Sequence, residues 1–277
     1  MEKHSQRSEP KNLNSVWRFL RRCLFSVLSF GPMPKHIAFI MDGNRRYAKK
    51  MKIKEGSGHN VGFTSLVSSL QYCYEMGVKY VTVYAFSIDN FKRKPEEVGS
   101  LMHLMKEKID QLLEEESIVH KFGLKINFWG SLDLLAEPIR SAAEKAMVHT
   151  ANNTGPVLSI CVAYTSTNEI LRAINKSCAR LEDKTEEVCS DPANSILVTD
   201  LEENLDSASC SEPDIVLRTS GETRLSNFLL WQSTFSHLQY PNLFWPEFSL
   251  RHLIWSVLEY QKVYPYLEAR RRLCQET

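Results

Sequence analysis

Short apolar runs recur along the chain from residue 31 onward, and each is bounded by polar residues, glycine or proline. The runs are rich in β-branched and aromatic residues, which is typical of buried strands. The pattern predicts five strands, at His36–Met41, Tyr80–Phe86, Lys125–Trp129, Val157–Ala163 and Ile215–Arg218.

Longer segments with helical spacing of apolar residues separate these runs. They predict helices at His59–Met76, Glu96–Phe122, Glu137–Asn152, Thr167–Leu181 and His252–Tyr266, with a further segment opening at Phe228–Trp231. Pro95 fits the first turn of the second helix, and Gly123 fits its end. Strands joined through such helices run parallel, because a crossover connection needs that length. We therefore expect an α/β fold, a single domain with a mainly parallel central sheet flanked by helices.

The N-terminal part differs from the rest. We expect 1–30 to form a polar tail followed by an amphipathic segment, with the folded domain at 31–277. On a helix over 16–30, apolar side chains share one face and three arginines lie elsewhere: Trp17, Leu20, Leu24, Val27 and Leu28 against Arg18, Arg21 and Arg22. This pattern is typical of a helix that lies in a membrane interface, and equally of a helix packed on the protein body. No apolar run approaches the ~20 residues that span a bilayer.

Composition narrows the possible functions. Lysine and arginine number 34 and aspartate and glutamate 33, so the formal net charge is +1. This balance argues against a nucleic-acid binder, and any anion site must be built from a few placed cations.

The segment 182–212 departs from the balance with ten acidic residues against Lys184 alone, and we expect it to be an acidic surface insertion. The seven cysteines form no C-x-x-C pair, which favours reduced thiols over zinc or disulfides.

Three polar clusters come directly after predicted strands, at 42–46, 87–93 and 218–226. Because the carboxyl ends of parallel strands meet at one edge of a sheet, we expect these clusters to converge. Together they contribute five arginines: Arg45, Arg46, Arg93, Arg218 and Arg224. The planar guanidinium group suits phosphate oxygens, so the pattern favours a diphosphate site, although surface salt bridges would use the same residues.

Asp42 lies among these cations at the end of the first strand. A carboxylate there could bind Mg²⁺ together with substrate phosphates, or it could cap a turn at Asn44–Lys50. His59 stands at the start of a predicted helix and is either a cap or a catalytic candidate. The chain has no G-x-x-x-x-G-K-[ST], G-x-G-x-x-G or H-E-x-x-H, so a phosphate site would differ from those of ATPases and dehydrogenases.

Three long motifs, in this order, closely resemble the cis-prenyltransferase family: HIAFIMDGNRRYAKK at 36–50, YAFSIDNFKR at 84–93 and RTSGETRLSNFLLWQ at 218–232, followed by LFWPEF at 243–248. The resemblance covers residues 31–266, and the N-R-R and S-G-E-x-R-L-S forms are similar to eukaryotic dehydrodolichyl diphosphate synthase-like catalytic subunits. Thr165-Ser166-Thr167 and Arg93-Lys94-Pro95 are similar to plant members, some of them associated with natural rubber. No D-D-x-x-D occurs, which excludes the usual magnesium site of trans-prenyltransferases.

The resemblance implies a defined chemistry. An allylic diphosphate, typically farnesyl diphosphate, loses its diphosphate, and the double bond of isopentenyl diphosphate attacks C1. Loss of a proton leaves a Z double bond, and repetition makes a long-chain polyprenyl diphosphate for dolichol or rubber in an apolar product tunnel. Mg²⁺ and arginines would neutralise the leaving diphosphate. The alternative is a non-catalytic polyisoprenoid-binding or scaffold subunit, but such subunits typically lose the aspartate and arginine clusters that this chain retains.

The resemblance also implies a role for each matching position. Asp42 matches the magnesium-binding catalytic aspartate, Asn90 the asparagine proposed to help proton removal, and His59 an assisting group. The allylic diphosphate site would comprise Gly43, Asn44, Arg45, Arg46, Tyr47, Ser87, Phe91 and Arg93. The isopentenyl diphosphate site would comprise Arg218, Glu222, Arg224 and Ser226. Four residues of the long helix are candidates for the tunnel wall, although core packing explains each equally well: Leu101, Leu104, Met105 and Leu112.

The chain departs from bacterial homodimers of the family at three places. Glu55 stands where they have an arginine of the allylic site, and His237 where they have a glutamate ligand of magnesium. The segment 270–277 lacks their R-x-G motif, which completes the neighbouring active site. Eukaryotic subunits that lack this motif work with a Nogo-B-receptor-like partner that supplies R-x-G in trans, so the resemblance implies a heteromer.

The insoluble product favours peripheral contact with the cytosolic face of the endoplasmic reticulum membrane, or with a rubber particle or other lipid monolayer.

Overall fold

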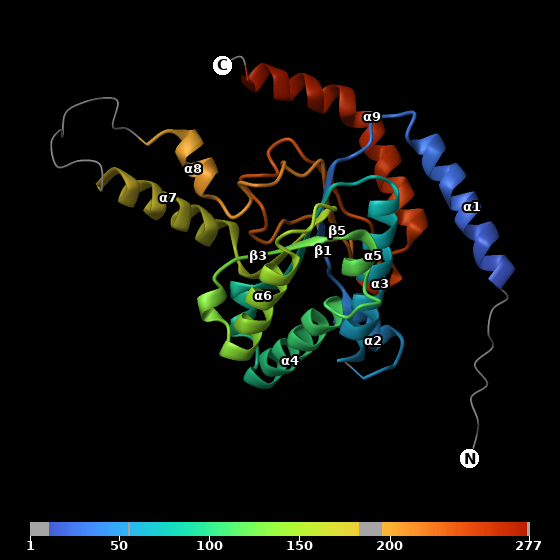
Figure 1. The fold of residues 1–277 in the computed structure, drawn as a ribbon, viewed down its shortest axis with the longest axis horizontal. Coiled ribbons are helices and arrows are strands. Elements are labelled where there is room, and N and C mark those ends of the chain that lie inside the picture. Colours follow the sequence, from blue (N-terminus) through green and yellow to red (C-terminus); the bar gives the residue numbers. More distant parts are fainter. Residues whose placement is uncertain (1–10, 55, 183–195, 276–277) are drawn as a thin grey trace.

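The computed structural model describes residues 11–54, 56–182 and 196–275. At its centre is a six-stranded sheet in the order β3-β4-β2-β1-β5-β6, in which every neighbouring pair runs parallel (Figure 1). The strands are β1 His36–Ile40, β2 Tyr80–Ser87, β3 Lys125–Trp129, β4 Val157–Tyr164, β5 Ile215–Arg218 and β6 His237–Gln239. The expectation of an α/β fold with a parallel sheet is confirmed.

Helices precede, connect and follow the strands. They are α1 Lys11–Leu28, α2 Asn44–Lys50, α3 Ser57–Glu75, α4 Pro95–Leu112, α5 Ile118–Phe122, α6 Glu137–Thr150, α7 Ser166–Glu182, α8 Val198–Asn204 and α9 Leu250–Gln275. Short 3-10 turns lie at Ile88–Lys92, Leu132–Leu134 and Trp245–Glu247. In Figure 1, α1 lies on the side of the molecule where α9 begins, and α7 and α8 lie on the other side.

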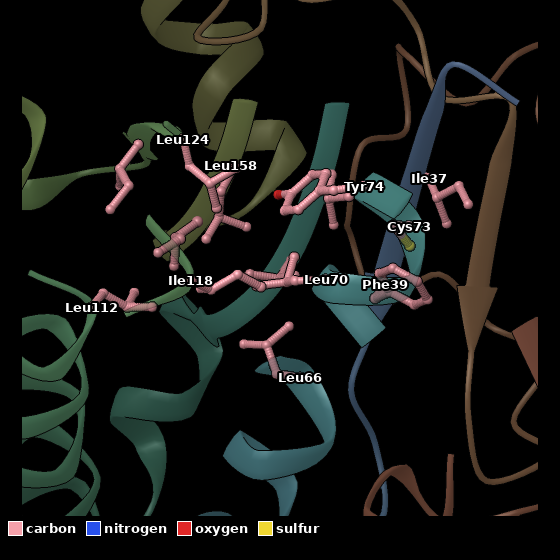
Figure 2. Close-up of a cluster of buried hydrophobic side chains, with 14 of the residues drawn as sticks. Ile37, Phe39, Leu66, Leu70, Cys73, Tyr74, Leu112, Ile118, Leu124 and Leu158 are labelled. Carbon is pink, nitrogen blue, oxygen red and sulfur yellow. The ribbon is translucent and has the colours of Figure 1, made fainter. Parts of the chain in front are cut away.

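The sheet is buried on both faces, because successive residues of a strand point to opposite sides. On one face, Phe39 of β1 joins a large core with side chains of α3, α4, α6 and α9; Figure 2 shows part of it, with Leu70 and Leu112. On the other face, Ala38 packs in a smaller cluster with Phe228, from the chain after β5. Burial on both sides explains why β1 is apolar throughout after His36, from Ile37 to Ile40.

The prediction of a single helix over Glu96–Phe122 is wrong in one respect, because the segment forms two helices. Helix α4 ends at Leu112, and α5 starts anew after Ser117, whose hydroxyl accepts a hydrogen bond from the backbone N–H of His120 at 3.5 Å. The intervening residues include three successive glutamates, and negative charge is unfavourable near the C-terminal end of a helix. Gly123 ends α5 in the left-handed conformation, as the sequence predicts.

Two elements do not follow from the sequence pattern. Strand β6 has only three residues and pairs with β5 at the edge of the sheet, while the predicted segment at Phe228–Trp231 forms turns. Helix α8 lies within the acidic insertion 182–212, of which 183–195 fall outside the described residues. The described end of this insertion is anchored to α7, since Asp206 pairs with Arg172 at 2.6 Å and Asn204 donates to Ser177 Oγ at 3.0 Å.

Helix α1 has two different sides. On the inner side Phe25 and Leu28 are buried in the large core, and Arg21 Nε pairs with Glu75 of α3 at 2.7 Å. On the outer side Trp17 and Phe19 are 64% and 66% exposed. Both alternatives for this segment therefore retain support: one face packs on the protein, and the other leaves large apolar side chains without protein cover.

Candidate active site

The chain turns sharply at Gly43, directly after β1. Its φ of +102° is left-handed, and a Cβ there would lie 2.4 Å from Ser220 Oγ and 2.7 Å from Phe244 Cδ1, so only glycine fits. The hydroxyl of Thr219 donates to the Asp42 carbonyl at 2.7 Å and accepts from the Asp42 N–H at 3.0 Å. Gly43, not Asp42, occupies the N-cap of α2 without a side-chain cap bond, so the capping alternative for Asp42 is wrong.

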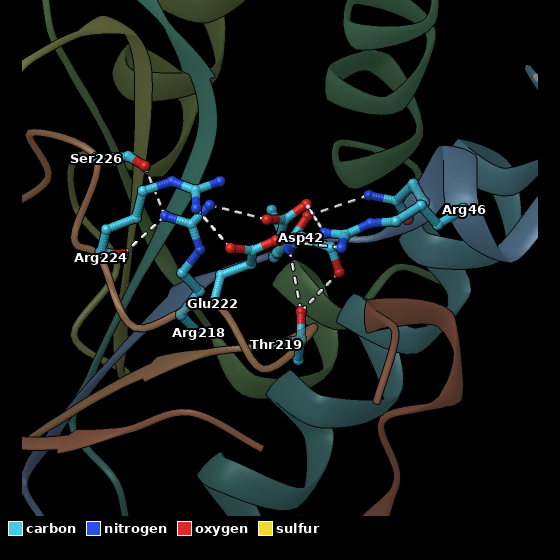
Figure 3. Close-up of polar contacts among 9 residues, drawn as sticks. Asp42, Arg46, Arg218, Thr219, Glu222, Arg224 and Ser226 are labelled. Atoms are coloured by element: carbon cyan, nitrogen blue, oxygen red, sulfur yellow. Dashed lines mark hydrogen bonds and ion pairs between the residues drawn. The ribbon is translucent and has the colours of Figure 1, made fainter. Parts of the chain in front are cut away.

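The turn places the Asp42 carboxylate between two arginines (Figure 3). Its Oδ2 accepts from Arg218 Nη2 at 2.8 Å, and its Oδ1 pairs with Arg46 Nη2 at 3.2 Å. The Arg218 side chain is only 6% exposed, because it ends β5 beside the end of β1. Partial burial alone would raise the pKa of Asp42, but the hydrogen bonds and charges of Arg218 and Arg46 outweigh it, and the pKa is lowered. Asp42 is therefore an anion held by two cations.

Arg218 and Arg46 also contact a second layer of groups. Arg218 Nη1 donates to Ser226 Oγ at 2.6 Å and to the Arg224 carbonyl at 2.7 Å. Glu222 pairs with Arg46 at 3.2 Å and with Arg224 at 2.5 Å, and the hydrogen bond from Arg224 is the main cause of its lowered pKa. Glu222 thus accepts hydrogen bonds from two exposed guanidinium groups, and a diphosphate could accept hydrogen bonds from the same groups.

An apolar cavity of about 630 Å³ begins at this polar cluster. This volume lies in the roughly 300–1,000 Å³ range of ligand sites. Eight of the predicted site residues line it: Asp42, Asn44, His59, Ser87, Asn90, Arg93, Arg218 and Ser226. The remaining wall is largely apolar and comes mostly from α3, α4, β2 and β4; it includes all four candidate tunnel residues, Leu101, Leu104, Met105 and Leu112. The three clusters therefore converge on one cavity, as parallel topology predicts.

Some predicted site residues do not line the cavity. Arg45 is exposed and pairs with Glu97 at 3.2 Å, which is the salt-bridge alternative for that position. Phe91 packs edge-on against Phe86 at 4.9 Å between ring centroids and belongs to the border of the core. Tyr47 is half-buried on α2 and is not among the lining residues.

Two predicted catalytic candidates have defined local positions. The Asn90 side-chain oxygen accepts from the Ser87 N–H at 3.1 Å, and this bond closes the 3-10 turn after β2. His59 lies inside the first turn of α3, whose N-cap is Gly56, so it is not a cap. Its side chain lines the cavity instead.

Of the residues at which the chain departs from the bacterial pattern, His237 is not part of this cavity. His237 begins β6 and pairs in register with Ile215, at the opposite end of β5 from Arg218, so it cannot share an ion with Asp42 of this chain. Glu55 lies outside the described residues.

Sequence reasoning missed three polar residues that line the cavity: Asp89, Lys108 and Asn227. Helical spacing could have found Lys108, because it lies four residues after Leu104 on the same face of α4. Asp89 and Asn227 each adjoin a residue already singled out, but nothing local distinguishes a lining residue from its neighbour.

The fold and the site together suit one kind of substrate. A parallel sheet whose carboxyl edge holds paired arginines and a carboxylate, above an apolar cavity, suits a substrate with a phosphorylated head and a hydrocarbon tail. Residues 40–266 match the prenyltransferase family model described for undecaprenyl diphosphate synthase. The chain therefore belongs to this family and is a prenyltransferase.

Individual relatives agree with the family match. A dehydrodolichyl diphosphate synthase of Solanum lycopersicum is 53% identical over 93% of this chain and 94% of the relative. A dehydrodolichyl diphosphate synthase complex subunit of Homo sapiens is 40% identical over 95% of this chain and 76% of the relative. The crystal structure of lavandulyl diphosphate synthase from Lavandula x intermedia, in complex with dimethylallyl diphosphate, has a TM-score of 0.76 and 27% identity, covering 83% of this chain and 95% of that one.

Proposed function

We propose that the chain is the catalytic subunit of a cis-polyprenyl diphosphate synthase, which adds isopentenyl diphosphate units to a farnesyl diphosphate primer. The observation that carries this proposal is the ion pair of Asp42 with Arg218 at the polar end of an apolar cavity. A prenyl diphosphate has a dianionic or trianionic head for the arginines and a hydrocarbon chain for the cavity. The names of the relatives support the same substrate class.

In this proposal the two diphosphates lie on either side of Asp42. Arg218, Arg224 and Ser226 hold isopentenyl diphosphate, while Arg46, Asn44 and Arg93 hold the allylic diphosphate. The allylic C1–O bond breaks and releases diphosphate, and the terminal alkene carbon of isopentenyl diphosphate bonds to C1. A proton then leaves C2 of the added unit toward the polar wall formed by Ser87 and Asn90. The positioned guanidinium groups stabilise the negative charge that develops on the leaving group.

We also propose Mg²⁺ as the cofactor, with Asp42 as its protein ligand. Among the described residues no group of three or more His, Cys, Asp or Glu side chains could hold a metal. One ionised carboxylate still fits Mg²⁺, which is often bound through one or two carboxylates and completed by water and substrate phosphates. When bound, the ion would add positive charge beside the leaving diphosphate.

A partner subunit is the next part of the proposal. The human relative is named as a subunit of a complex. In this chain Arg271, near the end of α9, pairs with Asp214 at 3.3 Å, and Asp214 precedes β5 at the end of the sheet away from Asp42. Arg271 is therefore held away from the Asp42 site of its own chain. We propose that a Nogo-B-receptor-like subunit supplies an R-x-G motif in trans.

Product analysis with and without this partner tests both proposals. The chain is incubated with farnesyl diphosphate, Mg²⁺ and labelled isopentenyl diphosphate, and the products are resolved by chromatography. We expect long polyprenyl diphosphates from the complex, formed at least about tenfold faster than by the chain alone, because a missing phosphate contact costs one or more charged hydrogen bonds. No incorporation by the complex would refute the function, and full processive activity of the chain alone would refute the partner.

We further propose that the outer side of α1 binds the cytosolic face of the endoplasmic reticulum membrane, or the monolayer of a rubber particle. None of the described helices is both long and apolar enough to cross a membrane. The large exposed side chains of α1 support an interfacial position instead: Val16, Trp17, Phe19, Leu20, Val27 and, just beyond the helix, Phe30.

Sedimentation with vesicles of phosphatidylcholine and phosphatidylserine tests this surface. Changing Trp17, Phe19 and Leu20 together to Gln should lower the bound fraction about tenfold or more, since each loses apolar area that the lipid would cover. The buried Phe25 and Leu28 stay intact in this variant. Matched Gln changes at Trp255 and Leu258, exposed apolar residues of α9, should leave binding unchanged. Equal binding of the α1 variant and the unchanged protein would contradict the proposal.

A further inference from the structure

The segment Thr165-Ser166-Thr167, where β4 passes into α7, contacts the loop that carries Ser226. The backbone N–H of Ser166 donates to the Asn227 carbonyl at 2.8 Å. The backbone N–H and the hydroxyl of Thr167 both donate to the Asn227 side-chain oxygen, at 3.0 and 3.1 Å. The first N–H groups of a helix have no partner within it, and here one residue from a distant loop accepts two of them.

The same loop is held by α7 at two further points. The backbone N–H of Leu230 donates to Ser166 Oγ at 3.1 Å, and Ser166 is fully buried. Gln232 Nε2 donates to Glu169 Oε2 at 3.0 Å, one turn further along α7. Contacts at Asn227, Leu230 and Gln232 therefore fix the position of the 226–232 segment against the helix.

The backbone of this segment is one that most side chains avoid. Ser226 and Asn227 have φ values of +50° and +59°, and Leu229 has +45°. Left-handed conformations of non-glycine residues persist where surrounding contacts determine them, and asparagine tolerates them better than most residues. The hydrogen bonds from Ser166 and Thr167 are such contacts.

The 226–232 segment is connected to the active site through Arg218. Ser226 Oγ accepts from Arg218 Nη1 at 2.6 Å, and the Ser226 carbonyl accepts from the Tyr84 hydroxyl at 3.3 Å. Arg218 in turn donates to Asp42. A shift of Asn227 would therefore move Ser226 and alter the donors that Arg218 presents to the cavity.

We propose that Thr167 and Asn227 form a latch that positions Ser226 and Arg218 to bind the diphosphate of the isopentenyl substrate. This inference rests on the proposed function, and it makes both latch members positioning residues. Because the latch lies on the Ser226 side of Asp42, its loss should weaken the binding of isopentenyl diphosphate more than that of the allylic primer.

Steady-state kinetics of the complex with latch variants tests the inference. Asn227→Gly keeps the left-handed backbone accessible but removes the acceptor, and Thr167→Val removes the hydroxyl at nearly constant volume. We expect KM for isopentenyl diphosphate to rise about tenfold in Asn227→Gly, and less in Thr167→Val, which keeps its backbone N–H. KM for farnesyl diphosphate should change less than about twofold, and the double variant should lose less than the two single effects combined.

Two controls separate positioning from general damage. Thr167→Ser keeps the hydroxyl and should have a near-normal KM. Thr234→Ala removes a hydroxyl that donates to the Trp231 carbonyl, three residues earlier, and should leave KM unchanged. Unchanged KM for isopentenyl diphosphate in Asn227→Gly, or an equal rise for both substrates, would overturn the latch. If the unchanged complex incorporates no isopentenyl units, the proposed function fails instead; calorimetric titration with inorganic pyrophosphate then tests the latch alone, since Asn227→Gly should still weaken that binding.

Discussion

Replacing Asp42 with Asn should lower turnover of the complex at least about a thousandfold, the scale seen when a preorganised group that stabilises transition-state charge is removed. Asn keeps the size of the side chain and one oxygen but removes the negative charge. That charge holds Arg218 and Arg46 at 2.8 and 3.2 Å, and it is the carboxylate that would bind Mg²⁺. The loss should lie mainly in kcat, because Arg218, Arg224 and Ser226, the residues that we propose for isopentenyl diphosphate, are unchanged.

The matched control is Glu75→Gln. Glu75 is also a carboxylate paired with an arginine, Arg21, and its side chain is 24% exposed against 27% for Asp42. It ends α3, where it contacts α1, and it does not line the cavity, so its loss should leave kcat unchanged. Single-turnover measurements of isopentenyl addition, together with the thermal unfolding midpoint of each variant, separate chemistry from folding. Persistent turnover in Asp42→Asn would mean that the active site belongs to the partner subunit.

The convergence of the active-site loops could be predicted because it follows from topology. Strands β3 and β5 have the bounds expected from their apolar runs, and β1, β2 and β4 each differ by one residue at the end. Once strands joined by long helices are taken as parallel, their carboxyl ends share one edge. Asp42, Asn90 and Arg218 then had to come together, whatever the details of the loops.

Elements that depend on long-range contacts could not be predicted in this way. Strand β6 has three residues of mixed polarity and is a strand only because β5 pairs with it. The apolar spacing of the Glu96–Phe122 segment continues across 113–117, so periodicity alone does not reveal that α4 ends. The cap at Ser117 and the three preceding glutamates were the local signals.

The contacts between charged side chains form a third category. The motifs identify Arg46, Glu222 and Arg224 as candidates, but only the folded chain shows Glu222 bridging the two arginines. The same holds for Asn227, whose partner Thr167 lies in another motif. Such pairs join segments far apart in the sequence, and a single sequence does not indicate which of these residues are in contact.

Stability should fall as pH is lowered from 7 to 5, and His36 should account for about 2 kcal/mol of that fall. His36 is 1% exposed at the start of β1. Its Nδ1 faces the Ser211 carbonyl, which only accepts, so Nδ1 carries the proton and Nε2 accepts from the Thr82 hydroxyl at 2.8 Å. Burial lowers the pKa of His36 from 6.5 to about 4, against the opposing effects of Ser211 and Asp214.

The sign follows from where the proton binds. Above pH 6.5 the imidazole is neutral in both states, so the contribution of its burial is fully present. Between pH 6.5 and about 4 the unfolded chain takes up a proton that the folded protein does not, so unfolding becomes progressively easier. Below the folded pKa both states are protonated, and the loss stops growing at about 3 kcal/mol in total.

Urea unfolding at pH 7 and pH 5 measures this contribution by difference. His36→Gln removes the titrating group, so its unfolding free energy should fall about 2 kcal/mol less between the two pH values than that of the unchanged protein. Other titrating groups, including the buried Glu169 whose pKa is raised by burial, are the same in both proteins, so their contributions cancel in the difference. His103→Gln, at an exposed position on α4, is the control and should keep the original pH dependence. Parallel pH dependence in His36→Gln and the unchanged protein would show that His36 takes up its proton equally in both states, and that the interior around β1 admits the charge.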